Sequence, residues 1–236
     1  MTDLEVAERA KKKKLFKDRK RTNILSGPEQ TFISFLVARI PAFITPNRLT
    51  AIGLFGSLLV MLGFILAYYG SQLFLLLGVA GLFINWFGDS LDGRIAYYRN
   101  IPRKWYGFSL DIVMDWVGTV LIGMGYFFYA KDGYEVLAFL FVVLYGWAMI
   151  ISQLRYRITD VYTIDAGLMG PTEIRIVIAL MILIEMLFFN TIHFFVGGIC
   201  VILFIINIID TRKLLKLGDD RDIADRKVKE LNKLID

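Results

Sequence analysis

Two short segments decide how this chain folds: residues 88–97, GDSLDGRIAY, and residues 107–115, GFSLDIVMD. They place four aspartates in otherwise apolar sequence: Asp89, Asp92, Asp111 and Asp115. Spacings of three and four residues put both members of each pair on one face of a helix. Because a carboxylate beside hydrocarbon is costly, four of them aimed at one place require a compensating partner, and divalent cations are suitable candidates. We therefore predict that the four carboxylates form a site.

The composition indicates that these acids belong to a membrane protein. Hydrophobic residues make up 56% of the 236 residues, aromatic residues make up 14%, and the mean hydropathy is +0.57. This is more apolar surface than one soluble core would hide. The isoelectric point is about 9.2, but a chain this apolar leaves no room for a polar face that binds RNA or DNA. We expect an all-α integral membrane protein that binds no nucleic acid.

Six windows are long and apolar enough to cross a hydrocarbon core of about 30 Å, which takes about 20 residues of helix. The windows are 47–68, 72–96, 107–129, 134–154, 172–189 and 191–210. The last two are joined so tightly at Asn190 and Thr191 that they must form a helical hairpin. The sequence therefore predicts six transmembrane helices in one membrane domain.

The positively charged residues predict the orientation of these spans. Ten lie at the ends that we assign to one side: Arg48, Arg94, Arg99, Arg103, Lys104, Arg155, Arg157, Arg175, Arg212 and Lys213. On the opposite side only Lys131 appears. By the positive-inside rule, both termini and the aspartates are expected to face the cytoplasm, in the cell membrane.

Polar extensions flank the predicted membrane domain. Residues 1–31 form a basic cytoplasmic tail with a lysine block at 11–14, which is either solvated or held at the membrane surface by anionic lipid. From Phe32 to Ile40, apolar residues recur at helical spacing and predict an amphipathic interfacial helix. Residues 32–211 would then hold this helix and the six spans, and residues 212–236 would form a charged cytoplasmic tail with a short exposed helix.

The order of the motif residues resembles a known family. Asp89-x-x-Asp92-Gly93-x-x-Ala96 followed by Gly107-x-x-x-Asp111-x-x-x-Asp115 is similar to the signature of the CDP-alcohol phosphotransferases, integral membrane enzymes of phospholipid synthesis. The segment Thr45-Pro46-Asn47-x-x-Thr50, in which Thr45 is suited to cap the first span, is also similar to that family. The resemblance covers roughly residues 40 to 210.

The resemblance implies a reaction in which a hydroxyl attacks the phosphorus of a CDP-linked substrate and CMP leaves. Two divalent cations per active site, Mg²⁺ or Mn²⁺, would neutralise the charge of the pyrophosphate. By analogy Asp89, Asp92, Asp111 and Asp115 are metal ligands, and Asp115 is also the candidate general base. Residues expected near the nucleotide are Asn47, Thr50, Gly93, Arg94, Ala96, Arg99 and Gly107.

One position departs from the family pattern. Tyr97 stands where the family has an arginine directly after the alanine, so a guanidinium that grips phosphate is missing there. Arg94 or Arg99 can supply the charge instead; otherwise the nucleotide site is altered or the chain is an inactive relative.

The acceptor is less defined by the sequence. Arg155, Arg157 and Arg175 lie where a polar or phosphorylated hydroxyl acceptor can dock, although positive-inside anchoring explains them nearly as well. Segment 165–173 lacks the Gly-Lys-x-x-Thr stretch of the phosphatidylglycerophosphate synthases, which argues against glycerol phosphate. The donor is either CDP-diacylglycerol, which the size of the chain favours, or a CDP-linked head group transferred to a lipid alcohol.

Two further expectations complete the prediction. Small residues at Gly118, Gly123 and Gly125 allow close helix packing, and the family resemblance suggests a homodimer. A divalent-cation transporter that uses the acids as an ion-binding ring is a competing function. Against it, all four acids lie near one mouth, and we expect no ionisable residue to continue a path through the far halves of the spans.

Overall fold

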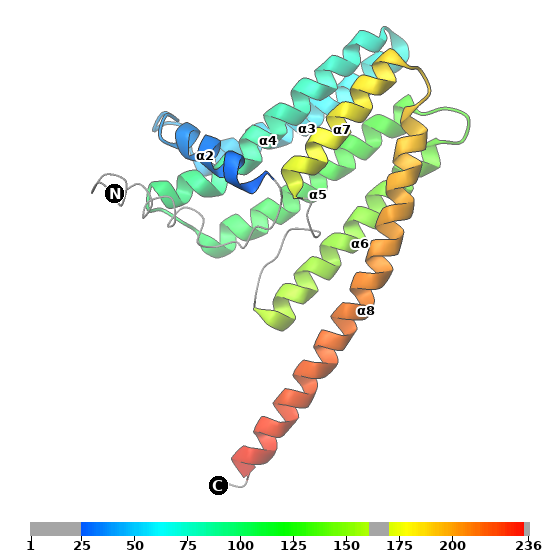
Figure 1. Cartoon of the computed structure of the whole chain (residues 1–236). Coiled ribbons are helices and arrows are strands. Elements are labelled where there is room, and N and C mark those ends of the chain that lie inside the picture. Colours follow the sequence, from blue (N-terminus) through cyan, green and yellow to red (C-terminus); the bar gives the residue numbers. More distant parts are fainter. Residues whose placement is uncertain (1–24, 161–169, 234–236) are drawn as a thin grey trace.

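The computed structural model describes residues 25–160 and 170–233, and within these ranges all regular secondary structure is helical, without strands. The elements in order are α2 (Ser26–Val37), α3 (Pro46–Tyr69), η1 (Gln72–Phe74), α4 (Leu75–Tyr98), α5 (Lys104–Tyr129), α6 (Glu135–Thr159), α7 (Pro171–Leu187) and α8 (Ile192–Lys233) (Figure 1). The all-α prediction is confirmed. The lysine block at 11–14 and residues 165–169 of the predicted turn lie outside the described residues.

Five helical segments are long and apolar enough to cross a membrane. They are α3, η1 with α4, α5, α6 and the first part of α8. The remaining predicted span forms α7, whose 17 residues lie at the lower end of the length that crosses a hydrocarbon core. The chain therefore has the helices of an integral membrane protein, with five segments of sufficient length and composition.

Helices α3 and α4 pack backbone against backbone along most of their length. A Cβ atom on Gly81 would lie 2.6 Å from the carbonyl oxygen of Gly56, and a Cβ on Gly88 would meet the backbone of Gly53 and Leu49. Real Cβ atoms do not approach that closely, so these positions require glycine. The close packing brings the polar end of α3 against the face of α4 that carries the first two aspartates.

The start of α3 follows the prediction from its sequence. The Thr45 hydroxyl accepts a hydrogen bond from the backbone N–H of Arg48, with 3.3 Å between nitrogen and oxygen, and Pro46 occupies the first helical turn. At the other end of the molecule, α7 and α8 form the expected hairpin. Asn190 makes the turn with a φ of 62°, a backbone conformation that asparagine tolerates.

The N-terminal helix differs from the predicted interfacial helix in its start and in its packed face. Helix α2 begins at Ser26, inside the predicted tail. It crosses α4 (Figure 1) and buries Ile33 and Val37 there, at 0% and 2% exposure. Phe32 and Phe35, within the predicted apolar stretch, are exposed. Helix α2 therefore carries apolar residues on two faces, and its location at a membrane interface stays a prediction.

Polar contacts also hold α2 against α7. The Thr172 hydroxyl donates to the Glu29 carboxylate over 2.7 Å, and the backbone N–H of Leu25 donates to Glu173 over 2.9 Å. Glu173 also accepts from the backbone N–H of Gly170 and so caps the start of α7, as expected for an acid in the first helical turn. Helix α2 is therefore fixed at the end of the bundle where the aspartates lie.

Helices α6 and α8 form a pair that extends away from the other helices (Figure 1). The buried Asn207 amide donates to the carbonyl oxygen of Leu144, and Arg155 pairs with Asp210 at 3.3 Å. Helix α8 continues without a break to Lys233. The predicted tail from residue 212 is therefore the exposed continuation of the last span and not a separate short helix.

The glycines of α5 are used within the chain. A Cβ on Gly118 would meet the Ser57 side chain, one on Gly123 would meet Val142, and one on Gly125 would meet the backbone of Met61. These small residues let α3 and α6 approach α5. They give no support to the homodimer, which stays a prediction.

Candidate functional site

The four predicted aspartates line one pocket between α3, α4 and α5. Its walls are Thr50, Gly53, Leu54, Asn85, Asp89, Asp92, Asp111, Met114 and Asp115. Helices α4 and α5 each contribute two aspartates, because the helical spacing within each pair turns both carboxylates inward. Helix α3 contributes Thr50, Gly53 and Leu54. The convergence expected from the sequence is thus seen in the structure, and Thr50 from the first motif joins it.

Three of the carboxylates are close enough to share an ion. Asp89, Asp111 and Asp115 are half-buried, and each offers an oxygen atom within 4.8 Å of the oxygens of the other two. Two like unit charges about 5 Å apart repel by about 3 kcal/mol at an effective dielectric constant of about 20. Carboxylate oxygens are the ligands that hard cations such as Mg²⁺ and Mn²⁺ prefer. The set therefore fits a hard divalent cation.

Asp92 lies at the edge of this trio and has partners of its own. One carboxylate oxygen accepts from the Thr50 hydroxyl at 2.6 Å, and the other accepts from the backbone N–H of Gly93. The sequence predicts all four aspartates as metal ligands and Asp115 also as the base. In the structure Asp89, Asp111 and Asp115 form the closest group, and Thr50 fixes the orientation of Asp92.

A cation from the protein already reaches the pocket. The guanidinium of Arg175 on α7 lies 2.7 Å from a carboxylate oxygen of Asp89 and also donates to the Asn85 side-chain oxygen at 2.7 Å. Asn85 in turn donates to the Gly53 carbonyl at 3.0 Å and to the Ser57 hydroxyl at 3.1 Å. The structure places Arg175 against the metal-binding candidates, and its role in acceptor binding stays a prediction.

Asn85 is the functional candidate that the sequence prediction missed. It precedes Asp89 by four residues and so shares its helix face, which is a signal that the sequence contains. A polar amide in the middle of an apolar segment is a second signal. Its position between Arg175 and α3 makes it the residue that orients the arginine.

Arg99, a proposed substitute for the missing family arginine, is engaged elsewhere. Its guanidinium donates to four backbone carbonyls in the segment that joins α2 to α3: Ile40, Pro41, Ala42 and Ile44. It therefore holds this segment to the end of α4. The structure does not bring Arg99 to the pocket.

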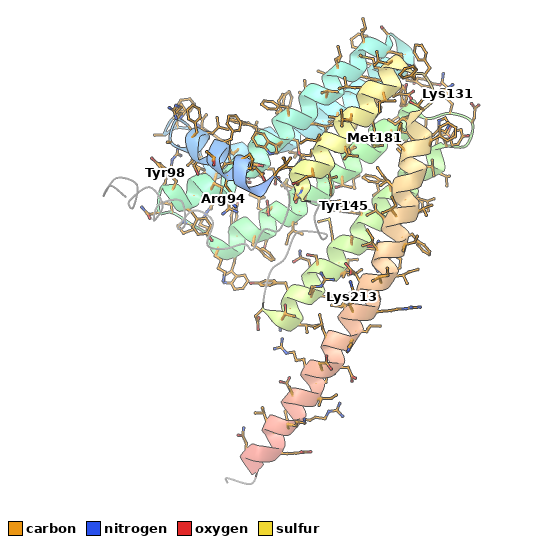
Figure 2. All side chains as sticks on the ribbon, viewed as in Figure 1. Arg94, Tyr98, Lys131, Tyr145, Met181 and Lys213 are labelled. Carbon is orange, nitrogen blue, oxygen red and sulfur yellow. The ribbon has the colours of Figure 1, made fainter. Side chains whose placement is uncertain are left out.

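The other nucleotide-binding candidates do not line the pocket. Arg94 is buried at 4% exposure, at the end of α4 that α2 crosses, near Tyr98 (Figure 2). Gly93 and Gly107 face open space, because a Cβ on either would meet nothing within 4 Å. The amide oxygen of Asn47 accepts from Arg103 at 2.7 Å. Ala96 is half-buried on α4.

The two remaining acceptor candidates lie on α6. Arg155 pairs with Asp210 on α8, and the carbonyl oxygen of Arg157 accepts from Arg221. Both contacts fasten α6 to α8. Neither arginine lines the aspartate pocket.

One expectation about the far end of the molecule was wrong. Glu185 is an ionisable residue in the far part of α7 and is only 1% exposed. The backbone N–H groups of Asn190, Thr191 and Ile192 donate to its carboxylate. The Glu185 carboxylate is hydrogen-bonded to the turn between α7 and α8, so it does not provide a second binding site for a transported ion. The argument against a transporter therefore holds, but for a different reason.

No protein-family model matches this chain, and no curated protein matches it. The similarity to the CDP-alcohol phosphotransferases therefore stays a resemblance of the motif residues.

Proposed function

We propose that this protein is a membrane phosphotransferase of the CDP-alcohol type, which transfers a substituted phosphate group from a CDP-linked donor to a hydroxyl and releases CMP. The observation that carries the proposal is the pocket in which Asp89, Asp92, Asp111 and Asp115 meet. Four acids in this order, with glycines at Gly93 and Gly107, are the motif of that chemistry.

The oxygen atoms of Asp89, Asp111 and Asp115 would hold the cations, two per site, with Asp92 beside them. When bound, Mg²⁺ or Mn²⁺ supplies positive charge that offsets the negative charge of a pyrophosphate. Thr50 keeps the Asp92 carboxylate turned into the pocket through its 2.6 Å hydrogen bond. Gly93 and Gly107 face open space and would leave room for a substrate there.

The chemical step uses one protein carboxylate as a base. The acceptor oxygen forms a bond to phosphorus as the bond from that phosphorus to CMP breaks, and Asp115 takes the proton of the hydroxyl. General bases typically contribute about 10²- to 10⁴-fold to such a step. The ion pair between Arg175 and Asp89 places a positive charge at the pocket wall.

The membrane setting favours a lipid substrate. We assign α7 as a sixth span, place the pocket and both termini in the cytoplasm by the charge bias of the sequence, and take CDP-diacylglycerol as the donor and a small polar alcohol as the acceptor. Helix α2 would lie at the interface, and the protein would act as a homodimer.

The test is CMP release by the purified protein in lipid nanodiscs. With Mg²⁺ and CDP-diacylglycerol, CMP should form only when an alcohol acceptor is added, and EDTA should stop it. A panel of acceptors then names the product, with a CDP-linked head group and diacylglycerol as the alternative pair. No CMP from either pair, from protein shown to be folded, would contradict the proposal.

A further inference from the structure

A small polar cluster of Asn47, Arg103 and Tyr106 lies at the outer end of the aspartate pocket. On α3, Asn47 precedes the pocket residues Thr50 and Leu54 by three and seven residues, a spacing that puts all three on one helix face. Three residues of helix correspond to about 4.5 Å. Asn47 is therefore one helical turn outside the pocket, on the face of α3 that lines it.

Helix α5 provides the facing side of this opening. Gly107 precedes the pocket residues Asp111 and Met114 by four and seven residues, so it lies on the pocket face of α5. A Cβ on Gly107 would meet nothing within 4 Å. Arg103 and Tyr106 belong to the turn of chain just before it. Open space above the pocket is therefore bordered by an arginine and a tyrosine from α5 and by an asparagine from α3.

The cluster holds the Arg103 guanidinium in a defined orientation. One of its nitrogens donates to the Asn47 amide oxygen at 2.7 Å, and its carbon lies 4.0 Å from the centre of the Tyr106 ring. The Asn47 amide nitrogen donates in turn to the Tyr106 hydroxyl at 3.2 Å. Arg103 is exposed, and no carboxylate of the described residues pairs with it. A guanidinium has five N–H donors in a planar fork that matches phosphate, so an oriented arginine without an acidic partner is suited to a phosphate ligand.

The other arginines near this end of the bundle are engaged elsewhere. Arg99 donates to four backbone carbonyls, and Arg48 donates to the carbonyl oxygen of residue 43. Arg94 is buried, and Arg175 pairs with an aspartate inside the pocket. Arg103 differs from these four in being both exposed and held at the pocket opening.

We propose that Arg103 binds the phosphate of the CMP part of the donor, with Asn47 as its positioning residue. The inference rests on the proposed function, in which the reacting phosphorus lies near Asp115, deeper in the pocket, and the CMP phosphate lies nearer the opening. The phosphorus–oxygen bond that breaks leaves its electron pair on CMP, so the negative charge beside Arg103 grows as CMP leaves. Arg103 would thus supply the positive charge that the chain lacks at Tyr97.

Isothermal titration of CMP into the protein in nanodiscs, with Mg²⁺ present, tests this role. Arg103→Gln should weaken CMP binding by about tenfold, the value of about one hydrogen bond to a charged group. Mn²⁺ binding, followed by electron paramagnetic resonance, should not change, because the aspartates are intact. Lys104→Gln is the matched control: it removes the neighbouring cation, whose Nζ lies 5.1 Å from the Trp105 ring centre, and should bind CMP like the wild type.

Asn47→Ala tests the positioning role, because it keeps the cation and removes the amide that orients it. CMP binding should weaken by about threefold, the value of one neutral hydrogen bond. A CMP affinity of Arg103→Gln equal to that of the wild type would overturn the proposal and leave the phosphotransferase function standing. An equal loss in Lys104→Gln would show a general effect of surface charge and would also overturn it. A wild-type protein that binds no CMP would overturn both this role and the proposed function.

Discussion

Carboxylates at the two ends of this molecule have opposite surroundings. At the far end, Glu185 accepts five hydrogen bonds: from the Tyr129 hydroxyl, the backbone N–H groups of Asn190, Thr191 and Ile192, and the Thr191 hydroxyl. At the near end, Asp89, Asp111 and Asp115 bring their oxygen atoms within 4.8 Å of one another. Arg175 pairs with one of these acids.

The difference separates an acid that stabilises the fold from acids that prepare a site. Glu185 offsets its loss of hydration with donors from its own chain and ties a turn together. The aspartates repel one another at the cost of stability, and such a cost is retained where a ligand compensates for it. The following variants test this contrast, from the largest expected effect to the smallest.

Asp89→Asn and Asp111→Asn should each reduce CMP release by more than about 100-fold. Loss of even an outer partner of a metal ligand costs about 10- to 100-fold, so loss of a ligand should cost more. The unfolding temperature of Asp111→Asn should stay the same or rise, because the repulsion within the trio falls. The unfolding temperature of Asp89→Asn should be lower than that of Asp111→Asn, because Arg175 loses its charged partner. Asp219→Asn, on the exposed part of α8, is the matched control, and retained turnover by either pocket variant would remove the metal-ligand assignment.

Glu185→Gln should lower the free energy of unfolding by about 2–3 kcal/mol, because its amide nitrogen cannot accept from the N–H groups of the turn. Below the unfolding temperature, the turnover number should not change. Thermal unfolding in detergent measures the first quantity and CMP release the second. Glu135→Gln changes a half-buried acid at the same end of the molecule and should have a much smaller effect on stability. Equal effects would mean that the hydrogen bonds of Glu185 to the turn do not stabilise the fold.

Arg175→Gln should tighten Mn²⁺ binding by about tenfold, as seen by electron paramagnetic resonance. A positive charge 2.7 Å from Asp89 opposes a cation in the same pocket, and Coulomb interactions at these distances amount to a few kcal/mol even at an effective dielectric constant of about 20. Arg175→Lys keeps the charge and should resemble wild type, and Arg155→Gln on α6 serves as the distant control. Weaker Mn²⁺ binding by Arg175→Gln would show that the arginine supports the cation site.

Tyr97→Arg should have the smallest effect. It restores the residue expected after Ala96, so the KM for the CDP-linked donor should stay the same or fall by up to about fivefold, the value of one partly exposed charge pair. Steady-state kinetics with varied donor measures this. A large rise in KM would give Tyr97 a role of its own in the site.

The sequence predicts those features of the site that depend on the spacing of residues along a helix. Periods of three and four residues identify which aspartates share a face, and hydropathy identifies the spans. Thr45 and Pro46 mark the start of α3 because their roles are local. These features follow from short stretches of chain and do not depend on the rest of the fold.

The contacts that could not be predicted join distant segments. Arg175 meets Asp89 across 86 positions of sequence, and Arg99 meets carbonyls about 55 to 59 positions away. The position of an arginine in the sequence does not indicate which distant helix end its side chain will contact. The packing of α2 could not be predicted for a related reason: both of its faces carry apolar residues, so periodicity alone does not identify the face that packs on α4.

The touching backbones of α3 and α4 also determine which part of the pocket can move. Two helices separated by side chains can slide as those side chains change rotamer, but Gly56 and Gly81 leave no such slack. Helices α3 and α4 therefore form a rigid pair, and Asp89 and Asp92 on α4 keep their positions. Helix α5 also lies against the α3 backbone, at Gly125, whereas α7 contacts α4 through side chains, since a Cβ on Gly78 would meet the Ile182 side chain at an ordinary 3.7 Å. Movement that admits a bulky substrate is therefore expected of α7, which carries Arg175.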